Sequence, residues 1–580
     1  MCMKKQKVRT LKYLKPYWFY ALLCSLTMVG EVLCDLFLPH HMAIIIDQGI
    51  KANNLNIIYM HGLYMLGIAV IGGLLGFLSA LFGSIASRSF GNDLRIACFK
   101  KAIHFSWSET DKLTTGSIIT RVTNDVITMQ IAVSVTIRMF VRTVMLFIGG
   151  IAFMVNINPK FGIVLLVVLP VEIIIMTIFL LKITPLFGKV QSSLDGLNDV
   201  MQENVTGSRV VKAFNAEEKE KLRFYDASLK LSNNSLKIDK LLSVLSPLQT
   251  ILLNVTVVLI LYIGGREVLE NHGFTIGLAS QSLTYITQIL NAVMNLGNLF
   301  QMLARAGTSN RRIKEILSSE SSIQSGELRN VIEGKIQFNH VSFAYSDDNY
   351  VVKDISFEVE KGKTLGIIGE TGSGKSSLVN LIPRFYDVNN GEIIIDETNI
   401  KDYELGYLRE NIGIVLQKAE LFSGTILDNL RWGKSDATLE EVREVCKIAQ
   451  ADDFIMSFKD GYDTPILEKG SSLSGGQKQR LSIARALLKH PKVLIFDDAT
   501  SALDLKTESN LFRALKENYQ DLTIIIIAQR IATIKDLDQI LVLNDGECSG
   551  LATSEALLKT NKIYQDIYYS QLSRGEEYGI

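Results

Sequence analysis

The sequence predicts two parts of different fold class: an α-helical membrane domain with six spans and long cytosolic helix extensions, then an α/β domain built around a phosphate-binding loop. Of the 580 residues, 48% are hydrophobic and 21% are charged, so apolar and charged residues are expected to be segregated along the chain. The long apolar runs precede residue 317, whereas short strand-like runs alternate with helical ones after residue 335. We therefore predict a membrane domain over residues 1–317, a polar linker over 318–334 and the α/β domain over 335–580.

Six apolar runs are long enough to cross a bilayer as helices. They lie at residues 17–37, 58–83, 131–156, 161–181, 242–264 and 276–304. Residues 1–15 carry lysines and an arginine but no acid, which places the N-terminus in the cytosol by the positive-inside rule. An even number of spans then brings the C-terminus back to the cytosol. A signal peptide fits less well, because the first run is long and no small-residue cleavage site follows it.

The segments between spans two and three and between spans four and five are long for loops. Residues 88–130 and 182–240 are polar, contain few prolines and keep a helical periodicity. We expect the membrane helices to continue through them into the cytosol, with turns near Gly116 and Gly207. Two ordinary cytosolic loops are the alternative, but loops of this length are uncommon.

Ionisable side chains inside the apolar runs indicate either a polar translocation path or ion pairing between helices, because a lone charge in a bilayer is costly. Two histidines near the end of the first run could bind a metal or haem, although a position at the outer rim without chemistry is the simpler interpretation. The residues concerned are Glu31, Asp35, Arg138, Arg142 and Glu172, and the histidines His40 and His41.

Charge and cysteine content narrow the range of partners. The formal net charge is zero, which argues against nucleic acid as a partner. The six cysteines are scattered without a CxxC spacing, so neither a disulfide framework nor a zinc site is expected. The lipid bilayer is the partner that the apolar runs predict.

The second part contains a phosphate-binding loop in the required order of strand, loop and helix. A strand pattern at 364–368 leads into GETGSGKSS at 369–377 and then into a helical pattern. Glycines let backbone N–H groups surround a phosphate, a lysine reaches the outer phosphates, and a hydroxyl binds Mg²⁺. We expect ATP to contact Gly369, Glu370, Thr371, Gly372, Ser373, Gly374, Lys375, Ser376 and Ser377.

Two more residues complete the predicted ATP site. Asp497 ends the apolar strand 493–497, and its carboxylate would hold Mg²⁺ through water. Tyr345 lies 30 residues before Lys375, and its ring can stack on adenine. A lone aromatic residue in such a position is more often part of a core, but the neighbouring motifs favour the binding role here.

Between the loop and Asp497 lies the segment Leu473-Ser474-Gly475-Gly476-Gln477. With this signature the whole chain resembles the ATP-binding cassette (ABC) superfamily, and most closely its exporters with a six-helix membrane domain fused ahead of one cassette. The resemblance implies that two cassettes enclose two ATPs, each held by the phosphate loop of one cassette and the signature of the other. ATP and Mg²⁺ are the implied cofactors, and a second half-transporter is the implied partner.

The resemblance assigns roles to further residues. Gln417 matches the glutamine loop, which would contact Mg²⁺ together with Ser376 and Asp497 and link the site to the membrane domain. Glu468 matches an exporter-specific position before the signature, and Asp504 matches a loop that crosses between cassettes. Residues 115–125 and 203–214 resemble the segments that flank the two coupling turns of the membrane domain.

The sequence departs from the family at three positions. Asp498 replaces the glutamate that orients or deprotonates the attacking water, Gln529 replaces the histidine that contacts the γ-phosphate, and Glu397 stands where a turn glycine is common. Aspartate is one methylene shorter than glutamate, and glutamine cannot carry a positive charge. Both catalytic changes beside an intact phosphate loop predict a degenerate site, one that binds ATP but cleaves it slowly.

We interpret the chain as one subunit of a heterodimeric exporter in a bacterial plasma membrane. Its partner would supply the intact glutamate and histidine, and its cargo would be amphipathic drugs, lipids or peptides. Two alternatives are a non-transporting ATP sensor that gates a partner and a haem or siderophore importer of the same architecture. The apolar spans contain no motif that identifies the cargo.

Overall fold

The structure, a computed structural model, describes residues 9–269, 274–345, 349–467 and 470–577. The chain divides into two compact units. Unit 1 comprises the described residues up to Ile103 together with Thr115–Ser319. Unit 2 comprises His104–Thr114 and the described residues from Glu320 onward. A short segment of the membrane half of the sequence thus belongs structurally with the second half.

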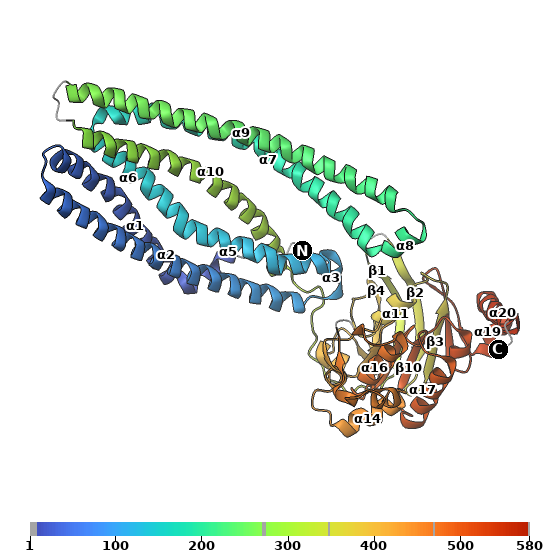
Figure 1. Cartoon of the computed structure of the whole chain (residues 1–580). Helices are drawn as coiled ribbons and strands as arrows, with labels where there is room; N and C mark the ends of the chain where they lie inside the picture. Colours follow the sequence, from blue (N-terminus) through green and yellow to red (C-terminus); the bar gives the residue numbers. More distant parts are fainter. Residues whose placement is uncertain (1–8, 270–273, 346–348, 468–469, 578–580) are drawn as a thin grey trace. The chain divides into compact units, whose positions relative to one another are not determined.

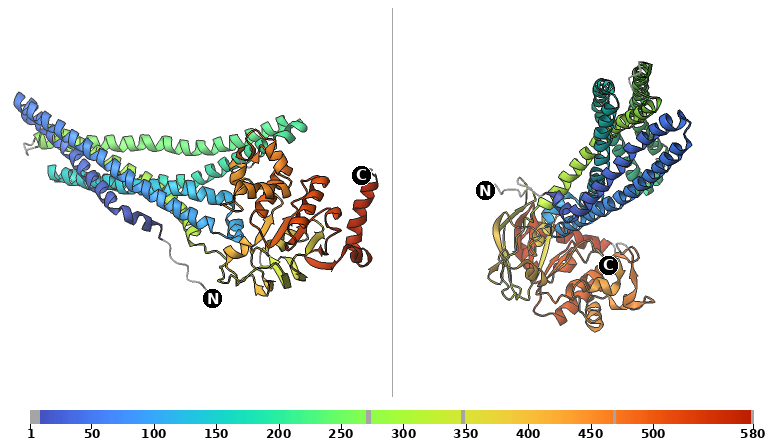
Figure 2. Two further views of the ribbon diagram at one scale, coloured as in Figure 1. Left: turned by 90° about the horizontal axis from the view of Figure 1, so that it is seen from below. Right: turned by 90° about the vertical axis from the view of Figure 1, so that its left-hand side faces the viewer.

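Unit 1 is built from long helices. Figures 1 and 2 show α1 beside α2 and α7 beside α9, and both pairs pack along their lengths. Short π-helical turns follow α1 and flank α5. The helices are α1 (Trp18–Ile44), α2 (Leu55–Ile103), α4 (Thr115–Thr120), α5 (Val126–Val135), α6 (Val141–Ile157), α7 (Pro159–Thr206), α8 (Ser208–Ala213), α9 (Glu217–Leu269) and α10 (Ile276–Ser318).

Five helical stretches in the described chain are long and apolar enough to cross a membrane, and they contain the first five predicted spans: Thr10–Ile50, Leu55–Ile103, Thr115–Ile157, Pro159–Thr206 and Glu217–Glu267. The predicted sixth span lies in α10, a helix of 43 residues, and stays a prediction. Because about 20 residues suffice to cross a bilayer, helices of 48 to 53 residues such as α2, α7 and α9 continue well beyond it. The first predicted turn is made by residues 104–114, just before Gly116, and Gly207 itself ends α7.

Three of the intramembrane charges form one ion cluster between α1 and α6. The Arg142 guanidinium donates to the Glu31 carboxylate and, over 2.8 Å, to Asp35 Oδ2. Glu172 on α7 accepts from Gln249 of α9 over 3.3 Å. These contacts favour pairing between helices for these residues, because each charge has a polar partner on another helix.

The predicted histidine pair lies near the end of α1. The His41 Nδ1 atom lies 3.0 Å from His61 Nδ1 on α2, and the His40 ring packs beside that of His41. Within the described residues no group of three histidine, cysteine or acidic side chains could hold a metal ion. The geometry of the described residues therefore gives no support for metal or haem binding by His40 and His41.

Unit 2 contains a six-stranded sheet in the order β12-β11-β3-β10-β9-β6 and a four-stranded antiparallel sheet in the order β2-β1-β4-β5. All neighbours in the larger sheet are parallel except β11 and β12. The strands of the larger sheet are β3 (Thr364–Gly369), β6 (Ile412–Val415), β9 (Val493–Asp497), β10 (Thr523–Ile527), β11 (Gln539–Asn544) and β12 (Glu547–Ala552). The smaller sheet comprises β1 (Ile336–Ala344), β2 (Tyr350–Val359), β4 (Asn390–Ile395) and β5 (Thr398–Asn399).

The central strands are buried on both faces, as expected of a parallel sheet covered by helices. Every residue of β9 and β10 is buried. Because side chains alternate along a strand, Leu494 and Phe496 enter one apolar core while Val493 and Ile495 enter the other. The α/β class predicted for this half is confirmed.

Apart from α3, which precedes all the strands, the main helices of unit 2 alternate with the strands along the chain. A two-stranded ribbon of β7 (Gly424–Thr425) and β8 (Pro465–Ile466) precedes the signature region. These helices are α3 (Trp107–Leu113), α11 (Lys375–Asn380), α12 (Leu405–Glu410), α14 (Leu439–Ile448), α16 (Gly475–Leu487), α17 (Leu505–Asn518), α18 (Ile531–Ile534), α19 (Ser554–Thr560) and α20 (Lys562–Glu577). Residues 319–335 join α10 to β1, and Leu328 exchanges backbone hydrogen bonds with Asp402 and Glu404.

Candidate functional site

Four predicted site segments come directly after four neighbouring parallel strands. The phosphate loop follows β3, Gln417 follows β6, Asp498 follows β9 and Gln529 follows β10. The last residue of β10, Ile527, is in register with Asp497 of β9 and Ile367 of β3. Because the carboxyl ends of parallel strands meet at one edge of a sheet, ligands of such folds bind there. The sheet thus brings residues that are far apart in sequence to one place.

These segments line a pocket of about 360 Å³. Its walls include Gly369, Lys375, Ser376, Gln417, Asp498 and Gln529. Sequence reasoning did not find Val351 of β2 or Ile527, which line the same pocket. Val351 lies on a strand of the other sheet, and the sequence pattern carries no signal that this strand reaches the phosphate loop.

The phosphate loop needs glycine where the backbone turns or approaches another strand closely. Gly372 and Gly374 have φ angles of +90° and +92°, which L side chains rarely adopt. A Cβ atom on Gly374 would lie 2.5 Å from the Val351 carbonyl oxygen. The loop wraps around the Lys375 ammonium, which donates to the Gly369 carbonyl over 2.9 Å and to the Glu370 carbonyl over 2.6 Å.

Oxygen donors suited to Mg²⁺ lie beside the loop. The Ser376 hydroxyl donates to Asp497 Oδ1 over 2.7 Å, and Asp497 is only 6% exposed. Burial raises the pKa of Asp497 above its usual value, and the hydrogen bond from Ser376 offsets only part of this rise. A hydroxyl and a carboxylate at this distance are hard oxygen ligands of the kind Mg²⁺ prefers. The residues present therefore fit the ion, which would neutralise phosphate charge at this point.

Asp498 accepts hydrogen bonds from two glutamines at the same atom. Gln417 donates to Asp498 Oδ2 over 3.0 Å, and Gln529 donates to it over 2.7 Å. Asp498 is 7% exposed and has a φ of +49°, a conformation that aspartate tolerates better than most residues. Asp498 and Gln529, the two predicted catalytic departures from the family pattern, are therefore in direct contact with each other.

Tyr345 lies at the margin of the loop. Its hydroxyl is 3.0 Å from Ser377 Oγ, and its ring meets those of Phe343 and Tyr386 edge to face. The side chain is 51% exposed, so a ring surface is left for a stacked base. This arrangement suits the predicted adenine contact.

The signature segment lies away from this pocket. Among the described residues, none of Leu473–Gln477 lines the pocket around Lys375. Ser474 caps α16: its Oγ accepts from the Gln477 backbone over 3.3 Å, and Gln477 Oε1 accepts from the Ser474 backbone over 2.9 Å. Serine followed three residues later by glutamine is a capping box, which the sequence alone could have revealed. Glu468 lies outside the described residues.

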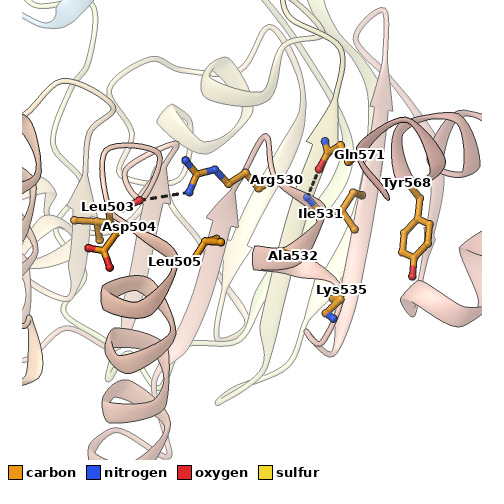
Figure 3. A pocket seen from close by; sticks show the side chains of 9 residues that line it. All are labelled: Leu503, Asp504, Leu505, Arg530, Ile531, Ala532, Lys535, Tyr568 and Gln571. Atoms are coloured by element: carbon orange, nitrogen blue, oxygen red, sulfur yellow. Dashed lines mark hydrogen bonds between the residues drawn. The ribbon is translucent and has the colours of Figure 1, made fainter. Parts of the chain in front are cut away.

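The crossing-loop residue Asp504 has a structural role within its own chain. It caps α17, accepting from the backbone and hydroxyl of Thr507 over 3.1 and 2.6 Å. These hydrogen bonds lower the pKa of Asp504. Asp504 also lines a second pocket of about 430 Å³ with Arg530, Tyr568 and Gln571, shown in Figure 3.

Unit 2 contains an aromatic contact between the first predicted cytosolic turn, residues 104–114, and the predicted nucleotide domain. The Trp107 ring of α3 stacks on Phe385 at 4.3 Å between centroids, and the Tyr386 hydroxyl donates to Asp111 over 2.6 Å. Burial and the Asp111 carboxylate raise the pKa of Tyr386. Sequence reasoning missed these residues. The only available signal was a lone tryptophan in a polar segment.

Comparisons with known proteins agree with this arrangement. Residues 20–293 match the family described as ABC transporter transmembrane region, and residues 352–501 match the family described as ABC transporter. The ABC transporter ATP-binding protein YfiB of Bacillus subtilis is 37% identical over 568 residues, which cover 98% of this chain and 99% of YfiB. The ATP-dependent lipid A-core flippase of Haemophilus influenzae is 31% identical over 563 residues, 97% of this chain and 96% of the flippase.

A solved structure is similar over nearly the whole length. A bacterial Atm1-family ABC exporter with ATP bound matches with a TM-score of 0.79 at 25% sequence identity. The match covers 96% of this chain and 98% of that exporter. The likeness thus extends over both the membrane domain and the nucleotide domain.

Proposed function

Because this chain belongs to the ABC transporter family, as an ATP-driven membrane exporter subunit with one membrane domain and one ATPase domain, we propose that it is the degenerate-site subunit of a heterodimer. In this proposal its own phosphate site binds ATP and cleaves it slowly. Its signature completes the competent ATP site of a different half-transporter. The observation that carries the proposal is the pair of hydrogen bonds from Gln417 and Gln529 to Asp498 Oδ2.

Asp498 is poorly placed to activate water. Its carboxylate lies about one C–C bond closer to the backbone than a glutamate carboxylate would, and a misplacement of about 1 Å can cost about 100-fold in rate. Its Oδ2 atom already accepts two amide donors, at 3.0 and 2.7 Å. One of the two carboxylate oxygens that could take a proton from water is therefore engaged, which favours slow cleavage.

Gln529 adds a second deficit. Charge develops on the γ-phosphoryl oxygens during phosphoryl transfer, and a positively charged or strongly donating group stabilises it. A glutamine amide is neutral, and its Nε2 atom donates to Asp498 over 2.7 Å. The same residues that weaken cleavage leave the phosphate loop intact, so binding of ATP is retained.

The signature supports a role toward a partner. It begins a well-capped helix, α16, outside the pocket that its own phosphate loop forms. A complete signature is useful only if it faces an ATP that is cleaved. A heterodimer provides such a site, whereas two copies of this chain would pair two complete signatures with two slow sites.

For the cargo we propose amphipathic molecules such as drugs, lipids or peptides. The likeness to a lipid A-core flippase supports a lipid-like cargo, and the likeness to an Atm1-family exporter supports outward movement. ATP-dependent uptake into inverted vesicles measures direction. Accumulation supports export, depletion would indicate import, and no movement would indicate a sensor.

The pairing is tested by unequal substitutions in the assembled pair. Gly475 suits this test, because a Cβ atom there meets nothing within 4 Å, so Gly475→Glu should leave the fold intact while placing an acid beside the partner's ATP. We expect ATPase activity to fall about 100-fold, the scale of losing one transition-state contact. Asp498→Asn should keep at least about half of the activity.

The matched control is Gly406→Glu, which adds the same side chain at an exposed helical position of the same domain. It should leave ATPase activity unchanged. Equal losses in Gly475→Glu and Asp498→Asn would contradict the proposed division of labour between the two sites.

A further inference from the structure

The last described helix, α20, is fixed to the core of the nucleotide domain at its start. Asn561 Oδ1 accepts from the Tyr564 backbone over 2.9 Å, and Asn561 Nδ2 donates to the Ser549 carbonyl over 2.9 Å. Tyr564 is fully buried, and its hydroxyl lies 2.8 Å from Ser554 Oγ. Residues seven apart lie on one face of a helix, so Gln571 projects from the same face as Tyr564.

Gln571 makes two hydrogen bonds to the backbone of the segment that follows β10. Its Oε1 atom accepts from the Ile531 N–H over 2.8 Å, and its Nε2 atom donates to the Gln529 carbonyl over 2.8 Å. Figure 3 shows the first of these bonds beside the pocket of about 430 Å³. One side chain thus holds the backbone on both sides of Arg530.

The Arg530 side chain adds weaker contacts to this segment. Ile531 begins the short helix α18, whose N-cap residue Arg530 makes no capping hydrogen bond. The Arg530 guanidinium reaches the carbonyls of Ser501 and Leu503 over 3.4 Å each and Glu508 Oε2 over 3.8 Å. The Ile531 and Ile534 side chains are buried in the apolar core and anchor α18, so the hydrogen bonds of Gln571 act on the short stretch of backbone between β10 and that helix.

We propose that Gln571 is a positioning residue of the phosphate site, acting through the backbone of Gln529. The Gln529 side chain donates to Asp498 Oδ2 over 2.7 Å, and the Gln529 backbone carbonyl accepts from Gln571 Nε2 over 2.8 Å. Release of that carbonyl lets the segment move into the pocket and withdraws the Gln529 amide from Asp498. Gln529 lines the pocket around Lys375, so its displacement would loosen ATP held there. This inference rests on the proposed function, in which this site binds ATP and cleaves it slowly.

The test uses the full-length chain in lipid nanodiscs and two readouts. Hydrogen exchange of the segment 526–534 reports the Ile531 N–H directly. Dissociation of a fluorescent ATP analogue reports the function of the site. Gln571→Leu is one bond shorter than glutamine, keeps an apolar side chain at this position and removes both hydrogen bonds. Loss of two neutral hydrogen bonds changes an equilibrium constant by about tenfold. We therefore expect amide exchange and dissociation of the analogue each to become about tenfold faster.

Two further variants separate positioning from stability. Gln565 lies on the same helix and donates to the Leu558 carbonyl over 2.7 Å, so Gln565→Leu removes a similar bond without touching the segment. It should change neither readout by more than about twofold. Gln571→Glu keeps the acceptor for Ile531 but loses the donor for Gln529. It should keep exchange slow while still speeding dissociation.

The proposal is overturned if Gln571→Leu and Gln565→Leu dissociate the analogue at the same rate, or if Gln571→Leu speeds exchange without affecting dissociation. Faster exchange throughout α20 in Gln571→Leu would also overturn it, because the residue would then stabilise the helix alone. Rapid ATP cleavage by the unmodified chain would refute the degenerate site instead. The exchange comparison would be unaffected by that result.

Discussion

Gln529 donates its side-chain amide to the Asp498 carboxylate over 2.7 Å, which joins the two catalytic positions at which this chain departs from its family. Gln417 donates to the same oxygen over 3.0 Å. Residues in direct contact show coupled mutational effects. The two departures are therefore expected to behave as one unit.

Restoring both positions should create a competent site. We expect Asp498→Glu with Gln529→His to raise ATP cleavage at this site at least about 100-fold, because the carboxylate regains its reach and the phosphate regains a donor that can be charged. The rise of about 100-fold corresponds to a drop in activation free energy, and each single change should recover much less than half of that drop. The measurement is steady-state ATPase of the assembled pair in which the partner's phosphate-loop lysine has been replaced. Lys375→Ala added to the restored chain should abolish the gain, and independent, additive effects of the two changes would argue against the coupling.

Retained ATP should hold the two cassettes near each other. Moving a two-state equilibrium from 1:99 to 99:1 takes about 5.5 kcal/mol, and two ATPs can share that work. Lys375→Ala weakens binding at this site, because its ammonium is the group that reaches the outer phosphates. Spin-label distances between cassettes during turnover should therefore shift to longer values, while Lys459→Ala, an exposed lysine of the same domain, should leave them unchanged. An unaltered distribution in Lys375→Ala would mean that Asp498 and Gln529 reflect loss of catalysis without a holding role.

The first cytosolic turn should transmit the ATP cycle to the membrane helices. Trp107 stacks on Phe385 with an interplanar angle of 11°, and such pairs contribute about 1 kcal/mol beyond their burial. Trp107→Ala should lower transport per ATP cleaved several-fold while ATP binding stays within about twofold. Tyr386→Phe keeps the ring and loses only the bond to Asp111, so its effect should be smaller. An unchanged ratio of transport to cleavage in Trp107→Ala would contradict this role.

The turn between β4 and β5 should be stabilised by glycine. Asp396 and Glu397 have φ angles of +48° and +66°, and a left-handed conformation costs a residue with a side chain about 1–2 kcal/mol. After the entropy cost of glycine, Glu397→Gly should raise the free energy of unfolding of the nucleotide domain by about 0.5–1 kcal/mol. Calorimetry should show a rise of about 2 °C in melting temperature. Glu397→Ala keeps the Cβ atom and should give no gain, so equal melting temperatures for the two variants would refute the explanation.

The sequence by itself determined the features that depend on short stretches of chain. The phosphate loop lies between a strand and a helix because glycines and apolar residues follow each other in order, and β9 and β10 are recognisable from continuous apolar runs. Glu397 could be singled out as an unusual turn residue, and its positive φ gives the reason. The long helices were predictable from apolar length followed by unbroken periodicity. Local propensity and burial decide these features, and both are written in neighbouring residues.

Only the tertiary structure decided which distant side chains meet. Asp498 accepts from Gln417, 81 residues away, and from Gln529, 31 residues away, because parallel strands bring their carboxyl ends together. Arg142 pairs with Glu31 and Asp35 across two helices, and Gln571 reaches the backbone of Gln529 from 42 residues away. A periodic pattern reports that a face is buried but not what it is buried against. The partner of each polar side chain is therefore set by strand order and helix packing, which the sequence specifies only through the folded chain as a whole.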